Sequence, residues 1–302
     1  MALPALPALP GLRINLNSPR PGLDFLMNGF RISALFYLAL LAQPGRLAAD
    51  SAPAAPEAER RDWVGKIKPG ERVEVDNPWG DVRVRFGGYA DAVEYHAVAQ
   101  PLSPGAAHLV IAATPIAGGL RISSRVDGGA LPAGAKDRVD VTVFVPKGAP
   151  LSVRTVRGAI EIRGVKGDVR AETETGEISI RGVDGLLSTR NGQGATAVML
   201  ERAAKGTKQS FESTTGDITI SFDAAAEPLV TAATSGEIST DVSIEISHHP
   251  HEEPSKTATA KVGAGNSAVS IRSKRGNIHI RQREDLRVAP SAPGQPATDS
   301  DD

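Results

Sequence analysis

The chain has 302 residues, of which 40% are hydrophobic and 23% charged, a balance that supplies a folded core and excludes a wholly disordered protein. The formal net charge of −1 gives no global positive field, so nucleic acid is not expected as a partner. The absence of cysteine excludes disulfides, thiolate metal sites, cysteine nucleophiles and the lipidated cysteine of a bacterial lipoprotein.

Residues 1–49 have the features of a secretion signal preceded by an extension. Arg31 precedes an apolar run, 32–42, and a Leu-Ala-Ala series ending at Ala49 fits a leader-peptidase site. The run has 42 − 31 = 11 residues, fewer than the roughly 18 of a membrane-spanning helix. We therefore expect translation from Met27, cleavage after Ala49, and a bacterial periplasmic or surface product without an integral membrane segment; an uncleaved anchor is the alternative.

The remaining chain is predicted to consist of short strands between two polar ends. Residues 50–62 and 289–302 are rich in Ala, Pro and acids, and we expect a disordered linker and a disordered tail. Between them, over 63–288, apolar and polar residues alternate in "RVEVD", "VTVFV", "IEIR" and "ITISF", bounded by Gly, Asn, Asp or Pro, which is typical of strands. Segments 195–206 and 222–229 are expected to form at most one or two helical turns.

Aromatic residues make up only 4% of the chain, so the predicted core consists mainly of Val, Ile, Leu and Ala. Such side chains suit thin, repeated layers better than a centre organised around large rings. Trp63, Trp79 and Tyr89 all stand near the first strands. We expect them to cover the end of the core.

Glycine returns every nine residues, at 158, 167, 176 and 185, and the sequence Ile-Arg-Gly-Val of 162–165 recurs at 180–183. A strand of four or five residues with a glycine turn cannot bury its apolar face alone, so neighbouring units must stack about 4.8 Å apart. The repeat therefore predicts an all-β fold, either a β-solenoid or a stacked two-sheet β-sandwich, built from about nine-residue strand-turn units paired into 18–20-residue double units.

Alternation with period two separates a core face from a wet face in each predicted strand. The isoleucines of the core face are predicted to form stacked apolar ladders; they are Ile160, Ile162, Ile178, Ile180, Ile218, Ile220 and Ile278.

A recurring element, T/S-x-x-G-[DENA]-I-x-I, appears as "TVRGAIEI", "TETGEISI", "STTGDITI" and "SKRGNIHI". It resembles the short strand repeat of a bacterial family of exported β-strand-repeat proteins known as "putative adhesins", a domain of unknown function, over roughly residues 70 to 285. The copy "AATSGEIST" departs from the pattern at Ala233 and Thr240. The resemblance implies a non-enzymatic protein of the cell envelope and supplies no catalytic residues.

The wet face suggests a binding surface. The residues predicted to form it are Arg163, Arg170, Glu172 and Arg181. Stacking places Arg163 and Arg181 in one column, a like-charge contact that acids such as Glu161 and Glu177 would offset. An anionic envelope polymer or another envelope protein is the predicted partner, and an ordinary solvated face is the alternative.

Catalysis is not expected. Glu172, Glu174 and Glu177 could supply the paired carboxylates of a glycosidase or polysaccharide lyase, which is the alternative function. However, neighbouring arginines predict solvated ion pairs, and the short glycine-bounded turns leave no long loops to wall a cleft. No cofactor is expected.

The run "SHHPHEEPSK" lies in a Pro-flanked insertion near 247–262. His248, His249 and His251 could bind zinc, nickel or copper weakly, because imidazole is a good ligand for these metals. A mobile polar loop is the alternative interpretation.

Overall fold

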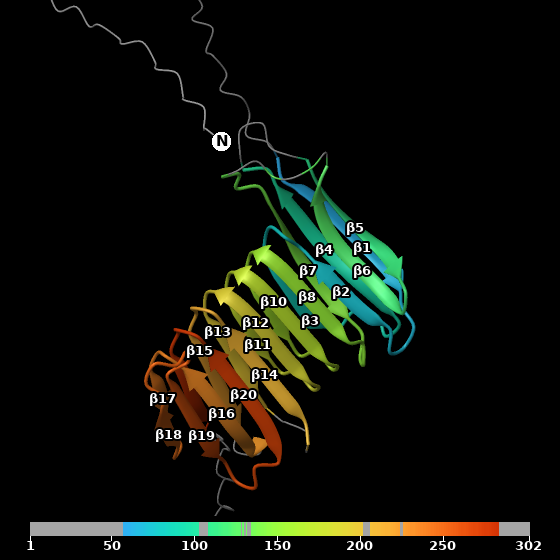
Figure 1. The fold of residues 1–302 in the computed structure, drawn as a ribbon. Coiled ribbons are helices and arrows are strands. Elements are labelled where there is room, and N and C mark those ends of the chain that lie inside the picture. Colours follow the sequence, from blue (N-terminus) through green and yellow to red (C-terminus); the bar gives the residue numbers. More distant parts are fainter. Residues whose placement is uncertain are drawn as a thin grey trace, which may run out of the picture. The chain divides into compact units, whose positions relative to one another are not determined.

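The computed structural model describes residues 57–283, except 103–107, 128, 130, 132–133, 202–205 and 224–225. All of these residues lie in one compact unit, Pro53–Asp302. The predicted signal segment 1–49 and the predicted tail 289–302 lie outside the described residues. The described strands form two sheets that face each other (Figure 1).

Sheet A has ten strands and sheet B has eleven, named here in spatial order. Sheet A consists of β1 (Glu59–Lys66), β4 (Ala92–Gln100), β7 (Arg138–Val145), β3 (Val82–Phe86), β9 (Ile160–Arg163), β11 (Ile178–Arg181), β13 (Thr196–Leu200), β15 (Ile218–Asp223), β21 (Ile278–Arg283) and β17 (Ile238–Thr240). Sheet B consists of β18 (Glu245–His248), β19 (Lys256–Lys261), β16 (Pro228–Thr234), β20 (Ser267–Ser273), β14 (Lys208–Ser213), β12 (Leu187–Gln193), β10 (Val169–Thr175), β8 (Leu151–Arg157), β2 (Arg72–Asp76), β6 (Gly119–Val126) and β5 (Leu109–Ile116).

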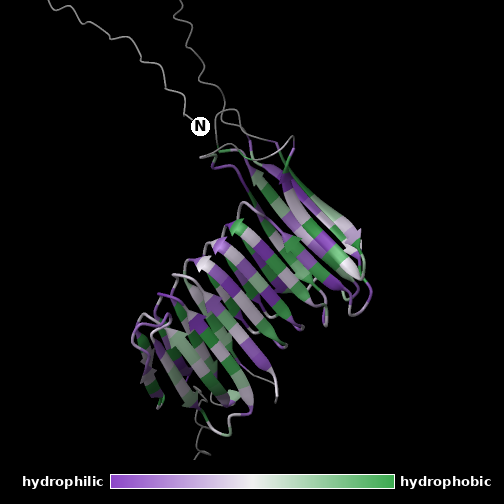
Figure 2. Cartoon of the chain, in the orientation of Figure 1, coloured by the Kyte–Doolittle hydropathy of each residue, from purple (hydrophilic) through white to green (hydrophobic). Residues whose placement is uncertain are grey.

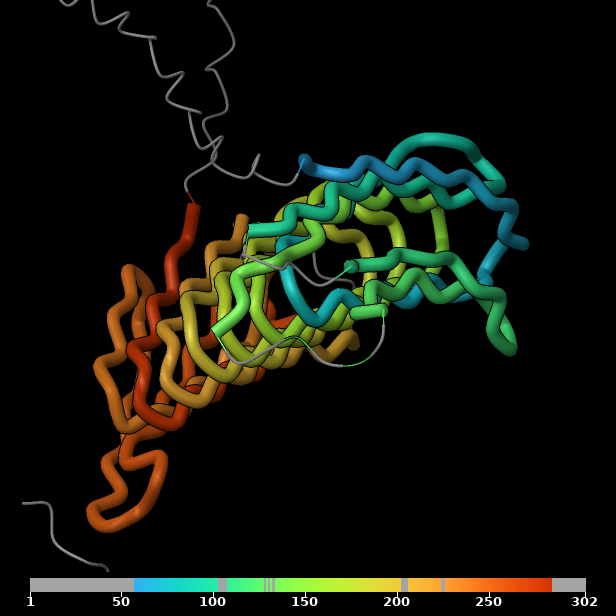
Figure 3. Tube along the Cα trace, turned by 90° about the horizontal axis from the view of Figure 1, so that it is seen from above, coloured from blue at the N-terminus to red at the C-terminus, as the bar shows by residue number. Residues whose placement is uncertain are grey.

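The central strands form coils in which a strand of sheet B turns directly into a strand of sheet A, as in β8–β9 and β10–β11 (Figure 3). The coils β8–β9, β10–β11 and β12–β13 pair in parallel with an 18-residue shift, so Ile160 lies opposite Ile178 and Leu151 lies opposite Val169. The predicted nine-residue unit is thus one strand and one corner, and the predicted all-β, solenoid-like fold is confirmed. Antiparallel pairs occur towards both ends, in β1–β4–β7, β5–β6 and β16–β19–β18, which makes both sheets mixed.

Two coils are inserted out of sequence order. β2 and β3 lie between the later strands β6 and β8 in sheet B and β7 and β9 in sheet A. β20 and β21 lie between the earlier strands β14 and β16 in sheet B and β15 and β17 in sheet A. Each end of the stack is therefore held together by a coil from a distant part of the sequence.

The predicted isoleucine ladders are confirmed. All seven isoleucines are at most 2% exposed, and Ile162 lies opposite Ile180 in the shared core. Inward apolar and outward polar residues alternate along the central strands (Figure 2). If a strand shifted by one residue relative to its neighbours, its apolar side chains would face solvent instead of this core.

The recurring Thr/Ser and Gly of the sequence element form the corner where sheet B turns into sheet A. A Cβ on Gly176 would lie 2.0 Å from the carbonyl oxygen of Gly158 in the next coil, so only glycine allows this approach. At several corners, a buried polar side chain three residues before the glycine satisfies the turn: Thr173 donates to the Gly158 carbonyl (3.3 Å), and Asn191 donates to the Gly176 carbonyl (3.0 Å). These bonds replace the ladder hydrogen bonds that the corner interrupts. The buried hydroxyl of Thr155, three residues before Gly158, forms no such bond.

Three elements differ from the sequence-based predictions. The linker predicted over 50–62 already forms β1 from Glu59, because pairing with β4 stabilises a segment that lacks apolar alternation. The helical turn expected in 195–206 is wrong for its first part, since Thr196–Leu200 is β13 and its Val198 and Leu200 enter the core. The insertion near 247–262 contains β19, which pairs with β16 and β18.

Of the three aromatic residues expected to cover the end of the core, two contribute to it. Trp63 and Trp79 are partly buried and pack against the core, and the Trp63 ring stacks on Tyr95 with centroids 5.7 Å apart. Tyr89 is 57% exposed, so its predicted role is wrong. It lies in the turn between β3 and β4, which projects its side chain towards solvent.

Candidate functional site

Three arginines occupy consecutive strands on the outer face of sheet A. Arg85 of β3 lies opposite Arg163 of β9, and Arg163 lies opposite Arg181 of β11. We call Arg85, Arg163 and Arg181 the arginine column. The inward neighbours of these residues are the core ladders, so the strand register places the backbones that carry the three arginines about 4.8 Å apart per step.

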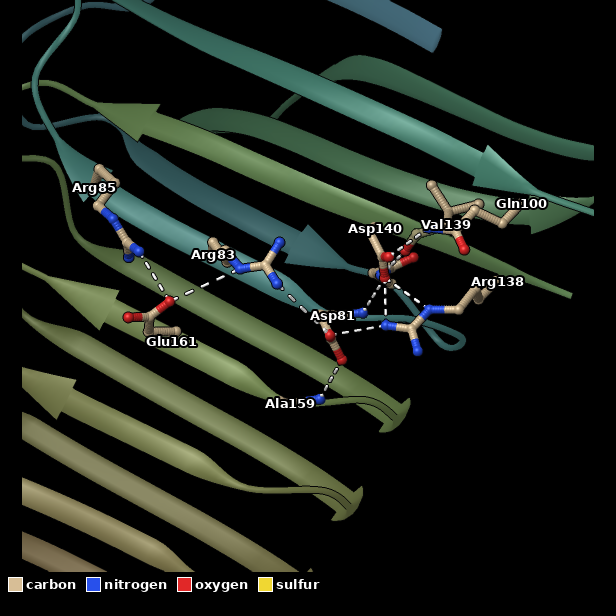
Figure 4. Close-up of polar contacts among 10 residues, drawn as sticks. Asp81, Arg83, Arg85, Gln100, Arg138, Val139, Asp140, Ala159 and Glu161 are labelled. Atoms are coloured by element: carbon tan, nitrogen blue, oxygen red, sulfur yellow. Dashed lines mark hydrogen bonds and ion pairs between the residues drawn. The ribbon is translucent and has the colours of Figure 1, made fainter. Parts of the chain in front are cut away.

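Glu161 partly neutralises the arginine column (Figure 4). Its carboxylate accepts a hydrogen bond from Arg85 Nη2 at 2.8 Å, pairs with Arg163, and lies 3.8 Å from Nε of Arg83. The hydrogen bond from Arg85, aided by the charges of Arg163 and Arg83, lowers the pKa of Glu161 below its usual range. One carboxylate therefore serves three cations.

Asp81 fixes the position of β3 beside β9. Its Oδ1 accepts the backbone N–H of Ala159 at 2.9 Å, and its Oδ2 lies 2.8 Å from Nη2 of Arg138. The Asp81 N–H in turn donates to Asp140 Oδ1 at 2.9 Å (Figure 4). An acid or amide directly after the corner glycine recurs as Asp217, which accepts the N–H of Asn277 at 2.7 Å. These contacts explain the aspartates at the [DENA] position of the repeat.

Arg181 has no acidic partner in the part of the chain that the structure describes. Within the described part of the chain no ion pair or side-chain hydrogen bond forms at Arg181. The expected offset by Glu161 is present for Arg163, whereas Glu177 lies exposed before β11 and pairs with no arginine of the column. The predicted stacking of Arg163 on Arg181 is correct, and its compensation is incomplete.

The other two predicted binding residues lie on the opposite face. Arg170 and Glu172 belong to β10 of sheet B and form an ion pair with each other. Since sheets A and B turn their outer faces in opposite directions, the four predicted residues do not make one surface. The error has a simple cause: each nine-residue half of the repeat belongs to a different sheet.

The outer face of sheet B contains a column of alternating charge on consecutive strands. Its members, in spatial order, are Asp76, Arg154, Glu172, Arg190, Glu212 and Arg272. Arg190 pairs with Glu212 at 3.1 Å. Each charge has an opposite charge on the neighbouring strand, so this face neutralises itself.

The structure does not bring the acidic residues considered for catalysis together. Glu172 and Glu174 project outward from β10 in sheet B, while Glu177 stands at the start of β11 in sheet A. Glu177 and Glu161 line a shallow depression of about 250 Å³ on sheet A. The pKa of Glu161 is lowered, which is opposite to the shift that a general acid requires.

The predicted metal ligands are spread along a hairpin. His248 ends β18 opposite Lys256, and Nε2 of His249 lies 3.0 Å from the Thr257 hydroxyl. His251 lies in the exposed turn between β18 and β19. In the residues that the structure describes, no three His, Cys, Asp or Glu side chains form a group that could hold a metal ion.

Apolar side chains around the end of β3 were not predicted from the sequence. Phe144 lies opposite Arg85, whereas Phe86 pairs with the buried Val145 and leaves sheet A on the side opposite to the arginine column. Phe86 and Tyr89 are 46% and 57% exposed. The only sequence signal is "RFGGY", an outward arginine followed by two aromatics around a glycine pair.

Two parallel-coiled sheets with glycine corners define the class of the protein as a solenoid-like β-repeat domain. Residues 135–281 match the family model "Toastrack DUF4097", so this part of the chain is a toastrack domain, as the resemblance predicted. The strands before this range, β1 to β6, belong to the same two sheets.

Solved structures give distant matches. A putative cell adhesion protein from Clostridium sporogenes is similar with 13% identity and a TM-score of 0.41, over 74% of this chain and 100% of that chain. A putative adhesin from Bacteroides fragilis is similar with 10% identity and a TM-score of 0.35, over 75% of this chain and 97% of that chain. Among curated proteins there is no match. In the described residues, no helix is long and apolar enough to span a membrane.

Proposed function

We propose that this chain is an exported protein of the bacterial envelope that acts by binding or scaffolding, without turnover. Its working surface is the arginine column, and its ligand is an anionic envelope polymer. The proposal takes its location, periplasm or cell surface, from the predicted signal segment 1–49.

The observation that carries the proposal is the unpaired Arg181 next to Arg163. Like charges directly opposite each other on neighbouring strands destabilise a sheet, and the single carboxylate of Glu161 offsets this only at one end. An anionic chain lying across β3, β9 and β11 would neutralise the column through several contacts in register. Arginine suits this task because its planar guanidinium binds carboxylate or phosphate oxygens in pairs.

The test changes Arg163 and Arg181 together to Ser and follows retention on the envelope fraction through a salt series. The native protein should be retained at low ionic strength and released as salt increases, because the contact is electrostatic and exposed. The variant should be lost at every salt concentration. The matched control changes Arg154 and Arg190 of sheet B to Ser and should behave as the native protein.

Equal, salt-insensitive retention of the native protein and the Arg163/Arg181 variant would refute the role of this surface. Retention that disappears after protease treatment of the envelope fraction would assign the column to another envelope protein.

A further inference from the structure

The two sheets have different numbers of strands at the end of the stack that contains β1 and β5. β2 and β3 follow each other in one coil, so they mark the same level in sheets B and A. Beyond this coil, sheet A continues through β7, β4 and β1, whereas sheet B continues only through β6 and β5. Among the described strands, β1 therefore has no counterpart in sheet B.

A hollow of about 390 Å³ lies between β1 and β5. Its walls include Arg61 and Trp63 of β1, Tyr95 of β4, and Leu109 and Ile111 of β5. Trp63 and Ile111 pack against the core but are only partly buried. The volume lies within the roughly 300–1,000 Å³ of ligand pockets. The core is thus open beside β5, at the level where sheet B has no strand opposite β1.

The outer edge of β5 has free backbone groups. β5 pairs with β6 alone among the described strands. The Asp127 N–H donates to the His108 carbonyl at 2.8 Å, and these two residues continue the register of the β5–β6 pair. Since hydrogen-bonded and non-hydrogen-bonded pairs alternate in an antiparallel ladder, the N–H groups of Leu109, Ile111 and Ala113 point away from β6. A further strand could pair with them.

β5 differs from the other three edges of the described sheets. Proteins protect sheet edges from pairing by making them short or charged. β1 carries five charged side chains in eight residues, β17 has three residues, and β18 has four. β5 has eight residues, none of them charged. Pro115 lacks an N–H, but it stands at the end of β5 away from the residues that line the hollow. Long, uncharged edges favour pairing with another strand.

The space beside β5 suits one strand better than a whole sheet. Because β1 extends one strand beyond β5, a second copy of this chain that paired through its own β5 would bring its sheet A against β1. The residues before β1 do not suit the position either, since Pro53 and Pro56 lack the N–H groups that pairing needs. A single extended segment from a different chain meets neither obstacle.

We propose that the edge of β5 binds one extended segment of another protein, which adds a strand to sheet B opposite β1. The backbone of this segment pairs with Leu109, Ile111 and Ala113. Its side chains at alternate positions are apolar and enter the hollow beside Trp63 and Tyr95, because successive side chains of a strand point to opposite faces. The main-chain hydrogen bonds supply affinity and the hollow supplies specificity.

The test attaches a strand to the purified chain and measures hydrogen exchange. The peptide KVTVTVTK with a Gly/Ser linker is placed before residue 50, because Glu59 lies 3.9 Å from His108 beside the hollow and the linker keeps the effective concentration high. Exchange at Leu109, Ile111 and Ala113 should be slowed at least tenfold relative to the chain without the peptide, since these amides gain partners. Exchange at Ile246 of β18 should stay unchanged.

A matched control attaches KVPVPVPK through the same linker. Proline removes the N–H groups needed for pairing but keeps the valines, so this peptide should leave exchange in β5 unchanged. On the protein side, Ile111→Asp places a charge in the hollow and should abolish the protection by KVTVTVTK, whereas the outward change Val110→Asp should retain most of it. Thermal unfolding of each variant verifies that its fold is intact.

Selection from a library of random eight-residue peptides on the native protein identifies the preferred segment. The selected peptides should have apolar residues at alternate positions, and Ile111→Asp should not retain them.

Equal exchange at the three amides with KVTVTVTK and KVPVPVPK would overturn the inference. Concentration-dependent dimerisation of the native chain that Ile111→Asp abolishes would also overturn it and assign this edge to a second copy. These measurements do not involve the arginine column, so their failure would leave the proposed function standing.

Discussion

The outer faces of sheets A and B arise from the same coils but have opposite charge patterns. On sheet B the charges alternate in sign through six strands, from Asp76 to Arg272. On sheet A three arginines, Arg85, Arg163 and Arg181, follow one another on consecutive strands. The central strands pair in parallel on both faces, so the two charge patterns differ only because the outward side chains differ.

This difference separates stabilisation from binding. A cross-strand pair of opposite charge contributes about 0.2–1 kcal/mol, and a like-charge pair costs a similar amount. Sheet B places opposite charges on neighbouring strands along its column, and Arg190 and Glu212 form an ion pair there. On sheet A, the neighbouring Arg163 and Arg181 do not form such an opposite-charge pair, and the ligand is expected to supply the missing negative charge.

The largest expected effect comes from a change in the core that the two sheets share. Changing Ile180 to Asp should destabilise the fold by several kcal/mol, because Ile180 is 2% exposed and an unpaired carboxylate would be buried between the two sheets. Chemical denaturation measures the loss. The neighbouring outward change Ser179→Asn should stay within about 0.5 kcal/mol, and a native-like unfolding curve for Ile180→Asp would show that the register is wrong.

The corner that joins the two faces should be the next most sensitive. Asn191 donates hydrogen bonds to the carbonyl oxygens of Gly176 (3.0 Å) and Gly194 (2.9 Å) inside the corner. Changing Asn191 to Ala leaves these carbonyls without that donor and should cost about 1–3 kcal/mol. In the exposed control, Thr175→Ala, only a bond to the Val156 carbonyl is lost, and solvent can replace it.

Reversing one charge on each outer face tests the difference between sheets A and B directly. Arg181→Glu gives Arg163 an opposite charge, so it should stabilise sheet A by a few tenths of a kcal/mol while abolishing polymer binding. Arg190→Glu places three acids in succession on sheet B and should cost roughly 1 kcal/mol with binding unchanged. Both stability changes should shrink at 1 M salt. Equal effects of the two substitutions on binding would remove the distinction between the faces.

The smallest expected effect concerns pH and the edge of sheet A. His96 of β4 contacts Asp62 of β1 at 2.8 Å and Glu94 at 2.9 Å, and the hydrogen bond to Asp62 raises the pKa of His96 above its usual range. A raised pKa means that protonated His96 stabilises the fold. This contribution is complete below the ordinary histidine pKa of about 6.5 and is lost as pH rises through the higher folded-state value.

Hydrogen exchange of β1 should therefore be slower at pH 5.5 than expected from its rate at pH 8, after correction for intrinsic exchange. His96 is half-exposed, so the difference should be small. The variant His96→Gln should abolish it, and Asp62→Asn should reduce it, because the contact of His96 with Glu94 remains. A pH dependence that persists in His96→Gln would assign it to other groups.

Much of the interior was predictable because its signal is local. Glycines nine residues apart with isoleucine at alternate positions predict stacked coils, and the burial of Ile160 and Ile178 opposite each other confirms this. The polar residue three positions before the corner glycine was also visible in the sequence. Its role in satisfying the corner carbonyls became clear only from the hydrogen bonds of Thr173 and Asn191.

The surface was predicted less well because it depends on which strands become neighbours. Arg163 and Arg170 are seven residues apart and were assigned to one face, although the corner between them places them on opposite sheets. Phe144 and Arg85 are far apart in sequence, and only the insertion of β3 between β7 and β9 brings them together. No local pattern encodes such an insertion.

The placement of β20 and β21 determines when the chain can finish folding. β16 and β17 are synthesised earlier, yet in the described structure they join the rest of their sheets only through β20 and β21. A chain that emerges N-terminus first thus keeps β14 and β15 with open edges until Arg283 has appeared, and open edges recruit strands of other molecules.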